Sequence, residues 1–526
     1  MTCFQDCKSR WRGYLMFFSV VILCLGSGAQ PGSNPSDARN IILFIGDGMH
    51  LMHEIAASRY LTGQDDQLSF HRFPRTAYVT TWDTSAYDRY AWWLNAPAYT
   101  ESQFDPFVGY HPVRGGAAPF PHDRSGSDAY FLTPLFPYGR TDGRPGVPAT
   151  DSASSATALA TGHKTASGRI AWCADGSDNG ALATIAEMMR ARKNAAIGVV
   201  STVPFSHATP AAFVSHNVSR GNVYTGRGGY DGLGIADEII TRTKPEVVIG
   251  GGHPNWDNPA FETNRGYLSK GLYDALKTSS EYVFVERREG VDGGRALAEA
   301  AAKARAESKK LFGLFGGEGG CFDPAKPNNS PGAPQVTQGS TENPTLGQAS
   351  VAALTVLSAN ENGFFLMCEQ GDIDWANHAN DFAWMIGAVW DLHDAVQAVV
   401  DYIDRPGDLL DWENTLLLVT SDHGNSYMRL NPDKPLGPGE LPAQEKSTDI
   451  DGQEERGFRY PGEEVRYGTF GHTNELVTLY GRGRGSEWID TYAGRLYPGS
   501  RILDNTEVFH VMAQAAGLDA ARSSAP

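Results

Sequence analysis

The chain has 526 residues, with 44 basic and 61 acidic side chains and a formal net charge of -17 at pH 7. A hydrophobic content of 41% with 20% charged residues excludes a disordered or fibrous chain. Phosphate backbones bind proteins that present clustered Lys and Arg, so the acidic balance argues against a nucleic-acid partner.

The first 29 residues have the pattern of an export signal. Three basic residues precede an apolar run at 14–26, and Ser27-Gly28-Ala29 follows as a small-x-small cleavage pattern. A membrane anchor is the weaker alternative, because the run is too short to span a bilayer. We therefore predict a signal peptide at 1–29, export to the periplasm or beyond the cell, and a single domain over 30–526.

Six short, nearly continuous apolar runs are typical of strands buried on both faces of a parallel sheet. They lie at 41–45, 196–200, 247–249, 364–367, 416–419 and 476–479. Helical patterns lie between them, at 182–192, 294–306 and 383–403. The alternation predicts an α/β protein with a doubly wound, largely parallel central sheet and helices on both faces. In such sheets the chemistry lies beyond the carboxyl ends of the strands.

Carboxylates follow three of these predicted strands. Asp47 comes after 41–45, Glu369 after 364–368, and Asp422-His423 after 416–419. A single Asp at a strand end can simply cap the next helix. Three like charges gathered at one sheet edge would repel unless cations neutralise them, so the pattern predicts a site for several metal ions.

Further metal-ligand patterns lie nearby in the sequence. If a helix begins after Gly371, Asp374 and His378 are four residues apart on one face, although an ion pair would have the same spacing. His472 precedes another predicted strand. Imidazole with carboxylate favours zinc, whereas ligation by oxygen alone favours magnesium.

The candidate nucleophile is Ser152, which the sequence places at the start of a helix. A helix N-terminus favours an incoming phosphate, but Asp151 or Ser152 could also serve only as a helix cap. The chain has no GxSxG elbow, and no His near Ser152 in the sequence offers itself as a base, which disfavours Ser-His-Asp acyl chemistry. A metal ion could ionise the hydroxyl instead.

Residues 82–148 are predicted to be an insertion, since 14 aromatic residues fall within 82–138. It forms either an ordinary small core of its own or a lid or dimer contact beside the site. Three other segments are predicted as surface loops from their Pro, Gly or charge content: 141–148, 326–346 and 431–466.

The cysteines do not form a disulfide framework. After removal of the signal, Cys173, Cys321 and Cys368 remain, so at most one disulfide is possible. Cys368 lies in an apolar run and is predicted to be a buried strand thiol. The stability of an exported protein of this size must then come from its core.

The motifs, taken together and in this order, resemble those of the alkaline phosphatase family. The matching segments are 40–49, 150–158, 207–212, 215–220, 369–378, 420–424 and 471–473. The resemblance implies a homodimeric metalloenzyme with two zinc ions and one magnesium ion per subunit. Such an enzyme hydrolyses small phosphate monoesters by in-line displacement through a phosphoserine intermediate.

The resemblance also implies roles for individual residues. Ser152 attacks phosphorus and Arg220 binds two phosphate oxygens, although Arg220 could instead be a surface charge. The expected ligands are Asp374, His378 and His472 for the first zinc, Asp47, Asp422 and His423 for the second, and Asp47, Thr209 and Glu369 for the third ion. Three residues are expected around these ligands: Asp151, His207 and Trp375.

Two positions depart from the best-known bacterial pattern of this family, which has Asp in place of His207 and Lys in place of Trp375. Loss of the Lys removes a water-mediated contact to phosphate and should weaken product binding. His207 makes the third site more attractive to zinc than an Asp would.

Two other function classes compete with a phosphomonoesterase. A phosphodiesterase or sulfatase of the same superfamily is the nearest, but Ser152 lacks the following Pro and Arg of sulfatases, and diesterases commonly use Thr. A noncatalytic phosphate-binding or metal-binding protein is the third, and it would not need a nucleophile.

Overall fold

The structure is a computed structural model that describes residues 37–110, 149–224, 229–406, 409–448 and 455–518. The predicted signal peptide at 1–29 and the predicted loop at 141–148 lie outside the described residues, as does 111–148 of the predicted insertion. No helix within the described residues is both long and apolar enough to cross a membrane.

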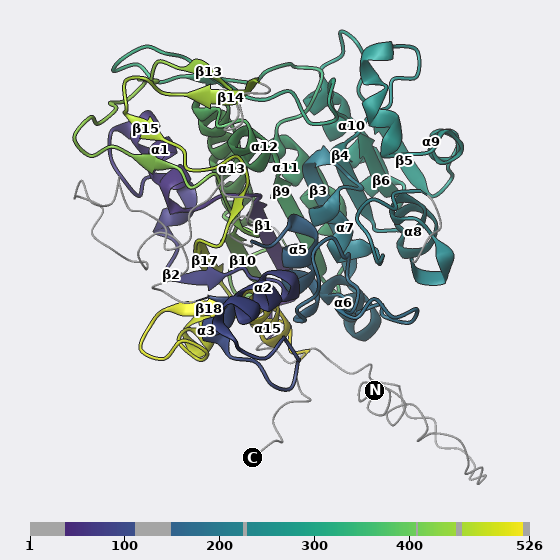
Figure 1. The fold of residues 1–526 in the computed structure, drawn as a ribbon. Coiled ribbons are helices and arrows are strands. Elements are labelled where there is room, and N and C mark those ends of the chain that lie inside the picture. The colour runs from purple at the N-terminus through teal and green to yellow at the C-terminus, as the bar shows by residue number, and fades with distance from the viewer. Residues whose placement is uncertain (1–36, 111–148, 225–228, 407–408, 449–454, 519–526) are drawn as a thin grey trace. The chain divides into compact units, whose positions relative to one another are not determined.

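A ten-stranded sheet forms the centre of the fold (Figure 1). In sheet order its strands are β18 (Ile502–Asp504), β2 (Arg75–Thr80), β17 (Val477–Gly483), β10 (Thr415–Thr420), β1 (Asn40–Gly46), β9 (Phe364–Gln370), β3 (Ala196–Pro204), β4 (Val247–Gly251), β6 (Lys310–Leu314) and β5 (Tyr282–Glu286). β17 runs antiparallel to both of its neighbours, whereas the other neighbouring pairs are parallel. The prediction of a largely parallel sheet is confirmed.

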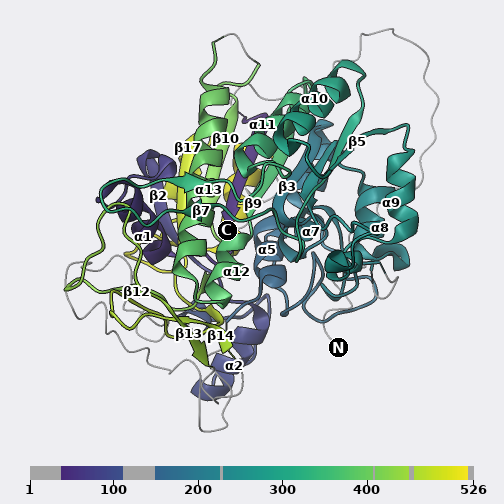
Figure 2. The same ribbon diagram turned by 90° about the horizontal axis from the view of Figure 1, so that it is seen from above.

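Helices cover both faces of this sheet (Figures 1 and 2). Along β1, Ile42 and Phe44 pack into one hydrophobic cluster and Ile41, Leu43 and Ile45 into the other, as expected for a strand buried on both faces. Four helices contribute to the first cluster: α1 (Leu51–Thr62), α10 (Gly293–Ala306), α11 (Leu346–Leu357) and α13 (Phe382–Ile403). Four contribute to the second: α5 (Ser152–Thr161), α6 (Ile185–Lys193), α7 (Ala208–Val214) and α15 (Asn505–Ala515). The doubly wound α/β class is therefore confirmed.

Shorter elements complete the described chain. The other helices are α2 (Thr84–Leu94), α3 (Pro106–Gly109), α8 (Ile235–Glu238), α9 (Lys270–Lys277), α12 (Asp372–His378) and α14 (Trp488–Tyr492), with single turns at η1 (Ser69–Arg72), η2 (Tyr230–Gly232), η3 (Ile239–Thr243), η4 (Pro259–Phe261) and η5 (Thr263–Gly266). Four small ribbons pair β7 (Lys326–Pro327) with β8 (Val336–Thr337), β11 (Gly424–Asn425) with β16 (His472–Thr473), β12 (Arg429–Leu430) with β15 (Val465–Arg466), and β13 (Glu445–Thr448) with β14 (Glu455–Arg459). Of the segments predicted as loops, 326–346 and 431–466 thus contain short strands, because their paired backbones form ribbons outside the main sheet.

Strand register brings the predicted acidic strand ends to one edge. Ile45 in β1 pairs with Glu369 in β9 on one side and with Thr420 in β10 on the other. Asp47 and Asp422 each follow two residues after these paired positions, so both lie at the same edge as Glu369. Cys368, one position before Glu369, is a fully buried thiol as predicted, and Cys173, Cys321 and Cys368 form no disulfide within the described residues.

Candidate metal and phosphate site

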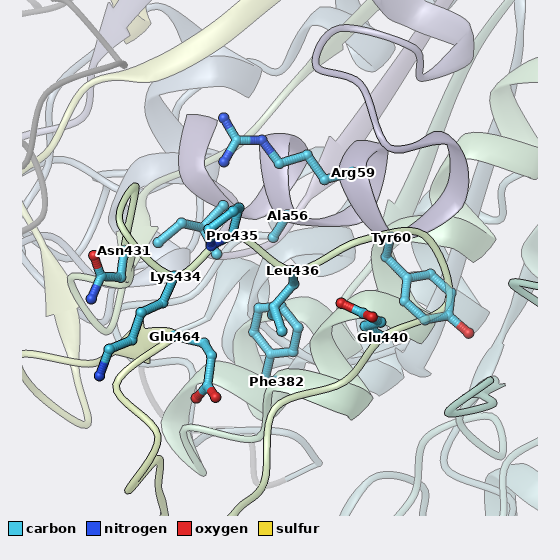
Figure 3. A pocket seen from close by; sticks show the side chains of 11 residues that line it. Ala56, Arg59, Tyr60, Phe382, Asn431, Lys434, Pro435, Leu436, Glu440 and Glu464 are labelled. Atoms are coloured by element: carbon cyan, nitrogen blue, oxygen red, sulfur yellow. The ribbon is translucent and has the colours of Figure 1, made fainter. Parts of the chain in front are cut away.

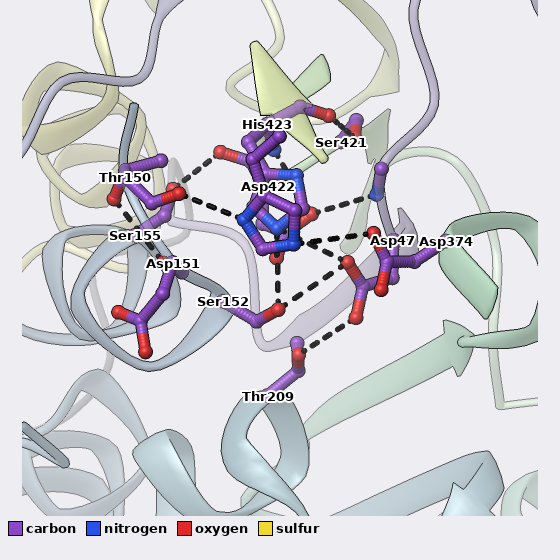
Figure 4. A network of polar contacts seen from close by, with 12 residues as sticks. Asp47, Thr150, Asp151, Ser152, Ser155, Thr209, Asp374, Ser421, Asp422 and His423 are labelled. Atoms are coloured by element: carbon purple, nitrogen blue, oxygen red, sulfur yellow. Dashed lines mark hydrogen bonds and ion pairs between the residues drawn. The ribbon is translucent and has the colours of Figure 1, made fainter. Parts of the chain in front are cut away.

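A buried cluster of two carboxylates and one imidazole lies where β1 and β10 end (Figure 4). His423 Nε2 is 3.4 Å from Asp47 Oδ1 and 3.3 Å from Asp422 Oδ2. Gly48 N donates to Asp422 Oδ1 at 3.1 Å, with Gly48 in the left-handed region at φ +70°. A Cβ at Gly48 would lie 2.7 Å from Asp374 Oδ1, so only glycine fits between Asp422 and Asp374.

A second cluster adjoins the first and comes from α12 and β16. Asp374 Oδ2 is 3.2 Å from His378 Nε2, and Asp374 Oδ1 is 3.5 Å from His472 Nε2. The two imidazole Nε2 atoms are 3.1 Å apart. The ring of His472 stacks on that of His423 with centroids 3.7 Å apart. One side-chain nitrogen or oxygen from each of Asp374, His423 and His472 also lies within 4.8 Å of the others. His423 therefore belongs to both clusters, which are directly adjacent.

The three imidazoles are oriented by backbone carbonyls through their Nδ1 atoms. These contacts are His378 to Phe470 O at 2.7 Å, His472 to Thr150 O at 2.8 Å, and His423 to Gly424 O at 3.2 Å. A carbonyl oxygen only accepts, so each Nδ1 carries a proton and each Nε2 is directed at the carboxylates. Histidines that bind metals in proteins are commonly oriented in this way.

Three of the four buried carboxylates of the site lack compensating charge. Burial and then the neighbouring carboxylates raise the pKa of Asp47 well above its ordinary value, and burial raises the pKa of Asp422 to about 6 and that of Glu369 to about 7. Burial would also raise the pKa of Asp374, but His378 and His472 hold it well below its ordinary value. Among the described residues, Asp422 Oδ2 and Glu369 Oε1 have no hydrogen-bond partner. The donor set and these orphaned oxygens fit divalent cations.

The residues expected around a third ion come together in part. Thr209 Oγ1, in the first turn of α7, donates to Asp47 Oδ2 at 3.5 Å, and Glu369 Oε2 accepts from Ser201 Oγ at 2.5 Å. His207 precedes α7, and its Nε2 lies 3.2 Å from Arg220 Nη2 while its Nδ1 has no partner among the described residues. The rings of Trp375 and His207 lie nearly perpendicular to each other, with centroids 5.9 Å apart.

Ser152 is the first residue of α5, and Asp151 caps that helix by accepting from Ser154 N at 3.0 Å. Ser152 Oγ lies 3.2 Å from His423 Nε2 and 3.5 Å from Asp47 Oδ1. The expectation that no His lies near Ser152 holds only along the sequence, because the fold brings His423 from 271 residues away. His423 does not form a Ser-His-Asp triad, since its Nδ1 contacts a backbone carbonyl while its Nε2 faces the carboxylates.

Arg220 lies beside the start of α5 and is half-buried rather than a free surface charge. Its Nη1 donates to Asp151 Oδ2 at 3.1 Å, its Nη2 contacts His207 Nε2 at 3.2 Å, and its backbone N donates to Gly168 O at 2.7 Å. Burial raises the pKa of Asp151, but Arg220 and two backbone N–H groups outweigh burial and lower it. Two of the five guanidinium N–H groups are used in this way, which leaves three for a ligand.

Several supporting residues were not predicted from the sequence. Ser154 Oγ lies between Asp151 Oδ1 at 2.7 Å and Asp83 Oδ2 at 2.8 Å, and Asn425 Nδ2 donates to Asp374 Oδ1 at 2.6 Å. Asn425 lies two residues after His423, so its proximity in sequence was a usable signal. No such sequence signal existed for Asp83, because it lies 71 residues from its partner Ser154.

Comparisons with known proteins show the family of the chain. A sequence model of the family described as alkaline phosphatase matches residues 128–488, which is more than half of the chain. An alkaline phosphatase of Escherichia fergusonii is 33% identical over 333 residues, covering 59% of this chain and 65% of that enzyme. A streptomycin-6-phosphate phosphatase of Streptomyces griseus is 26% identical over 96% of this chain and 97% of its own length.

Solved structures share the fold. The alkaline phosphatase of the Antarctic bacterium TAB5 is 21% identical with a TM-score of 0.52, over 92% of this chain and 98% of that chain. The Thermus thermophilus alkaline phosphatase is 20% identical with a TM-score of 0.54, over 94% of this chain and 96% of that chain. Because the family model matches more than half of the chain, the chain belongs to the alkaline phosphatase family.

Proposed function

We propose that the protein hydrolyses phosphate monoesters to an alcohol and inorganic phosphate, with Ser152 as the nucleophile. The observation that carries this proposal is the position of Ser152 Oγ, 3.2 Å from His423 Nε2 and 3.5 Å from Asp47 Oδ1, at the start of a helix and beside Arg220. The names of the related phosphatases support it, and one of them is named for streptomycin-6-phosphate.

The chain's own residues perform the displacement as follows. Arg220, fixed by Asp151 and His207, binds phosphate oxygens through its remaining N–H groups and aligns phosphorus with Ser152 Oγ. Ser152 Oγ forms a bond to phosphorus as the bond to the alcohol oxygen breaks, and the proton lost from the Ser152 hydroxyl ends on the departing alcohol. Water then attacks the phosphoserine, which restores Ser152 and releases inorganic phosphate.

Two zinc ions and one magnesium ion per subunit are proposed as cofactors. Asp374, His378 and His472 would hold the first zinc, Asp47, Asp422 and His423 the second, and Asp47, Thr209 and Glu369 the third ion. When bound, the ions supply positive charge that favours ionised oxygens at neutral pH. The third ion could instead be zinc because of His207, so metal analysis of protein purified without chelators decides its identity: a zinc to magnesium ratio near two to one supports magnesium.

Export and a homodimer are part of the same proposal. Residues 1–29 would be removed as a signal peptide, and the mature chain would pair with a second copy. Of the insertion at 82–148, the described part 82–110 forms α2 and α3, and we propose that the insertion is a lid or a dimer contact. Light scattering of the mature chain tests the pairing, and the same measurement without 111–148, which keeps the buried Trp82 and Asp83, tests the dimer contact.

Parallel assays of a phosphate monoester and a phosphate diester test the function. Wild type is expected to cleave the monoester much faster than the diester, and Ser152→Ala to lose monoester cleavage while keeping its fold by circular dichroism. Ser177→Ala, an exposed serine, is the matched control and should retain activity. Faster diester cleavage would indicate a phosphodiesterase. Phosphate binding without hydrolysis of either ester would indicate a noncatalytic protein.

A further inference from the structure

A buried carboxyl group without an ion-pair partner adjoins the start of α5. Asp83 is 1% exposed and precedes α2, where its Oδ1 caps the helix by accepting from Ala86 N at 2.6 Å. Its Oδ2 lies 2.8 Å from Ser154 Oγ, in the first turn of α5. Among the described residues, these are the only hydrogen-bond partners of the carboxyl group, and no Lys or Arg forms an ion pair with it. An unpaired charge at such a buried position is costly.

Lys164 acts on Asp83 only at a distance. Its Nζ donates to Trp82 O and to Asn505 Oδ1, both at 2.6 Å, and lies 2.9 Å from Asp504 Oδ2. An ammonium group has three N–H donors, so these three acceptors use all of them. The positive charge of Lys164 is therefore paired with Asp504, and Asp83 contacts no counter-charge within the described residues.

The hollow beside α1 shows the more usual arrangement of charges (Figure 3). Arg59 and Lys434 line it, and each has an acid of its own. Arg59 Nε is 2.6 Å from Asp65 Oδ1, and Lys434 Nζ is 3.1 Å from Glu463 Oε2. Charges that are paired in this way stay ionised, whereas burial without a partner favours the neutral form of an acid.

Ser154 Oγ lies between two carboxyl groups but has a single proton. It is 2.7 Å from Asp151 Oδ1 and 2.8 Å from Asp83 Oδ2, and both are hydrogen-bond distances. With both acids ionised, the hydroxyl could donate to only one of them, and its lone pair would face the other carboxylate. Thr150 Oγ1, at 2.9 Å from Ser154 Oγ, supplies no proton to either acid, because its other contact is the backbone oxygen of Asp151 at 3.1 Å. The two short contacts therefore favour a second proton, carried by one of the acids.

Asp83 is the better holder of that proton. Asp151 Oδ2 accepts from Arg220 Nη1 at 3.1 Å. Asp151 Oδ1 accepts from Ser154 N and Gly168 N, each at 3.0 Å, and these donors stabilise the ionised form of Asp151. Burial raises the pKa of Asp83 to about 6, and the charge of Asp151 adds to this rise. Donation then runs in one direction, from Asp83 through Ser154 to Asp151.

We propose that Asp83, as a neutral acid, is a positioning residue for phosphate binding at Arg220, a role that rests on the proposed function of Arg220. Asp83 donates to Ser154 Oγ, and Ser154 donates to Asp151 Oδ1. Part of the charge of Asp151 is thereby engaged, so Arg220 is held in place without being drawn away from phosphate. Ionised Asp83 would compete for the Ser154 proton and leave Asp151 to attract Arg220 more strongly, and phosphate binding would weaken.

Other titratable groups lie near Asp83. Asp151 faces it from the start of α5, and Lys164 faces it from the segment after that helix. Asp504 and Glu507, at the start of α15, act on Lys164 by charge. Burial raises the pKa of Glu507 to about 7, so Glu507 and Asp83 both change charge between about pH 5 and about pH 8. A pH effect on phosphate binding therefore belongs to Asp83 only if replacing Asp83 removes it.

Calorimetric titration of the full-length, metal-loaded protein with inorganic phosphate, at about pH 5 and about pH 8, tests the proposal. Asp83→Asn keeps an oxygen for Ala86 N and an N–H for Ser154 Oγ, and it cannot ionise. It is expected to bind phosphate as wild type does at the lower pH, and about 2-fold to 12-fold more tightly than wild type at the higher pH. Comparing the two proteins at each pH cancels the titration of phosphate itself.

Asp83→Ser separates the chain of hydrogen bonds from the helix cap. A serine can still cap α2, but its side chain is too short to reach Ser154, so phosphate binding should weaken about 2-fold to 12-fold at the lower pH. Asp292→Ser is the matched control, because Asp292 caps α10 in the same way at an exposed position, and it should bind phosphate as wild type does. Melting temperatures show whether each variant folds.

Infrared difference spectra of wild type and Asp83→Asn give a readout that does not depend on phosphate. At the lower pH, wild type should show the carbonyl band of a protonated carboxyl group that Asp83→Asn lacks. The proposal is overturned if this band is absent, if the affinities of wild type and Asp83→Asn keep a constant ratio at both pH values, or if Asp83→Asn binds as weakly as Asp83→Ser. Failure of the proposed function looks different, because wild type would then cleave no phosphate monoester while the band and the affinities kept the expected pattern.

Discussion

Replacing Arg220 tests whether the guanidinium binds phosphate in the way that its position indicates. Its Nη1 and Nη2 are each engaged on one side, by Asp151 Oδ2 at 3.1 Å and by His207 Nε2 at 3.2 Å. The planar group is thereby fixed, with donors remaining for two phosphate oxygens. Arg220→Lys keeps the positive charge but offers a single nitrogen, which cannot reproduce both contacts.

The expected size of the effect follows from the bonds that are lost. A hydrogen bond between charged groups contributes about 1.5–3 kcal/mol, and 1.4 kcal/mol corresponds to a factor of ten. Losing one contact in Arg220→Lys should weaken the inhibition constant of inorganic phosphate about 10-fold to 150-fold. Arg220→Met loses both contacts and should weaken it by at least about 100-fold.

The assay is phosphate inhibition of the hydrolysis of an aryl phosphate monoester, together with kcat and KM. Arg288→Lys is the matched control, because its side chain is 70% exposed and its nearest acid is 4.0 Å away, and it should behave as wild type. Phosphate inhibition of Arg220→Lys within twofold of wild type would refute the reasoning, since the guanidinium would then make no specific contact with the anion.

Three further predictions concern the ions, the Ser154 hydroxyl and alkaline pH. Removal of the ions with a chelator should abolish hydrolysis, and the melting temperature of the apoprotein should then fall as pH rises from about 4 through about 7. Burial raises the pKa values of Asp422 and Glu369 to about 6 and about 7, so the folded state binds more protons than the unfolded state over that range. A melting temperature that rises with pH would contradict this reasoning. Ser154→Ala should lower the free energy of unfolding in urea by about 1–3 kcal/mol, because buried Asp83 loses its hydroxyl partner, and an unchanged value would contradict it. Burial lowers the pKa of His216, but its two glutamate partners raise it to about 9. The stabilising contribution of His216 is therefore full below about pH 6.5 and is lost as pH rises through about 9. The free energies of unfolding of wild type and His216→Gln, measured in urea over that range, should converge at the alkaline end.

The central strands could be predicted because their environment is uniform. β1, β9 and β10 are buried along their whole length, so their inner positions are apolar and polar residues occur only near the strand ends. β5 lies at the edge of the sheet and its apolar run at 283–285 is only three residues long, and β18 has three residues in all, so neither stands out in the sequence as a buried strand. The antiparallel direction of β17 could not be predicted, because the local sequence of a buried strand does not encode its direction.

The gathering of carboxylates at one edge could also be predicted, because parallel strands in register end together. The lateral contacts of the site could not. Ser154 meets Asp83 and Ser152 meets His423 across separations of 71 and 271 residues, and no local pattern records either contact. Such pairs depend on how α5 is positioned against the ends of β1 and β10, which is a property of the whole fold.

The division of the imidazoles between the two clusters is the part of the site that sequence position decides least. Asp374 directs Oδ2 toward His378 at 3.2 Å and Oδ1 toward His472 at 3.5 Å, while Asn425 donates to Oδ1 at 2.6 Å. The same carboxylate also falls within a group formed with His423 and His472. Asp374 can therefore share a cluster with either His378 or His423. The side-chain rotamers, and not the order of the motifs, decide which imidazole completes which cluster. Because β16 places His472 between them, a change that moves β16 should disturb both clusters together, whereas a change in α12 should disturb mainly the cluster that contains His378.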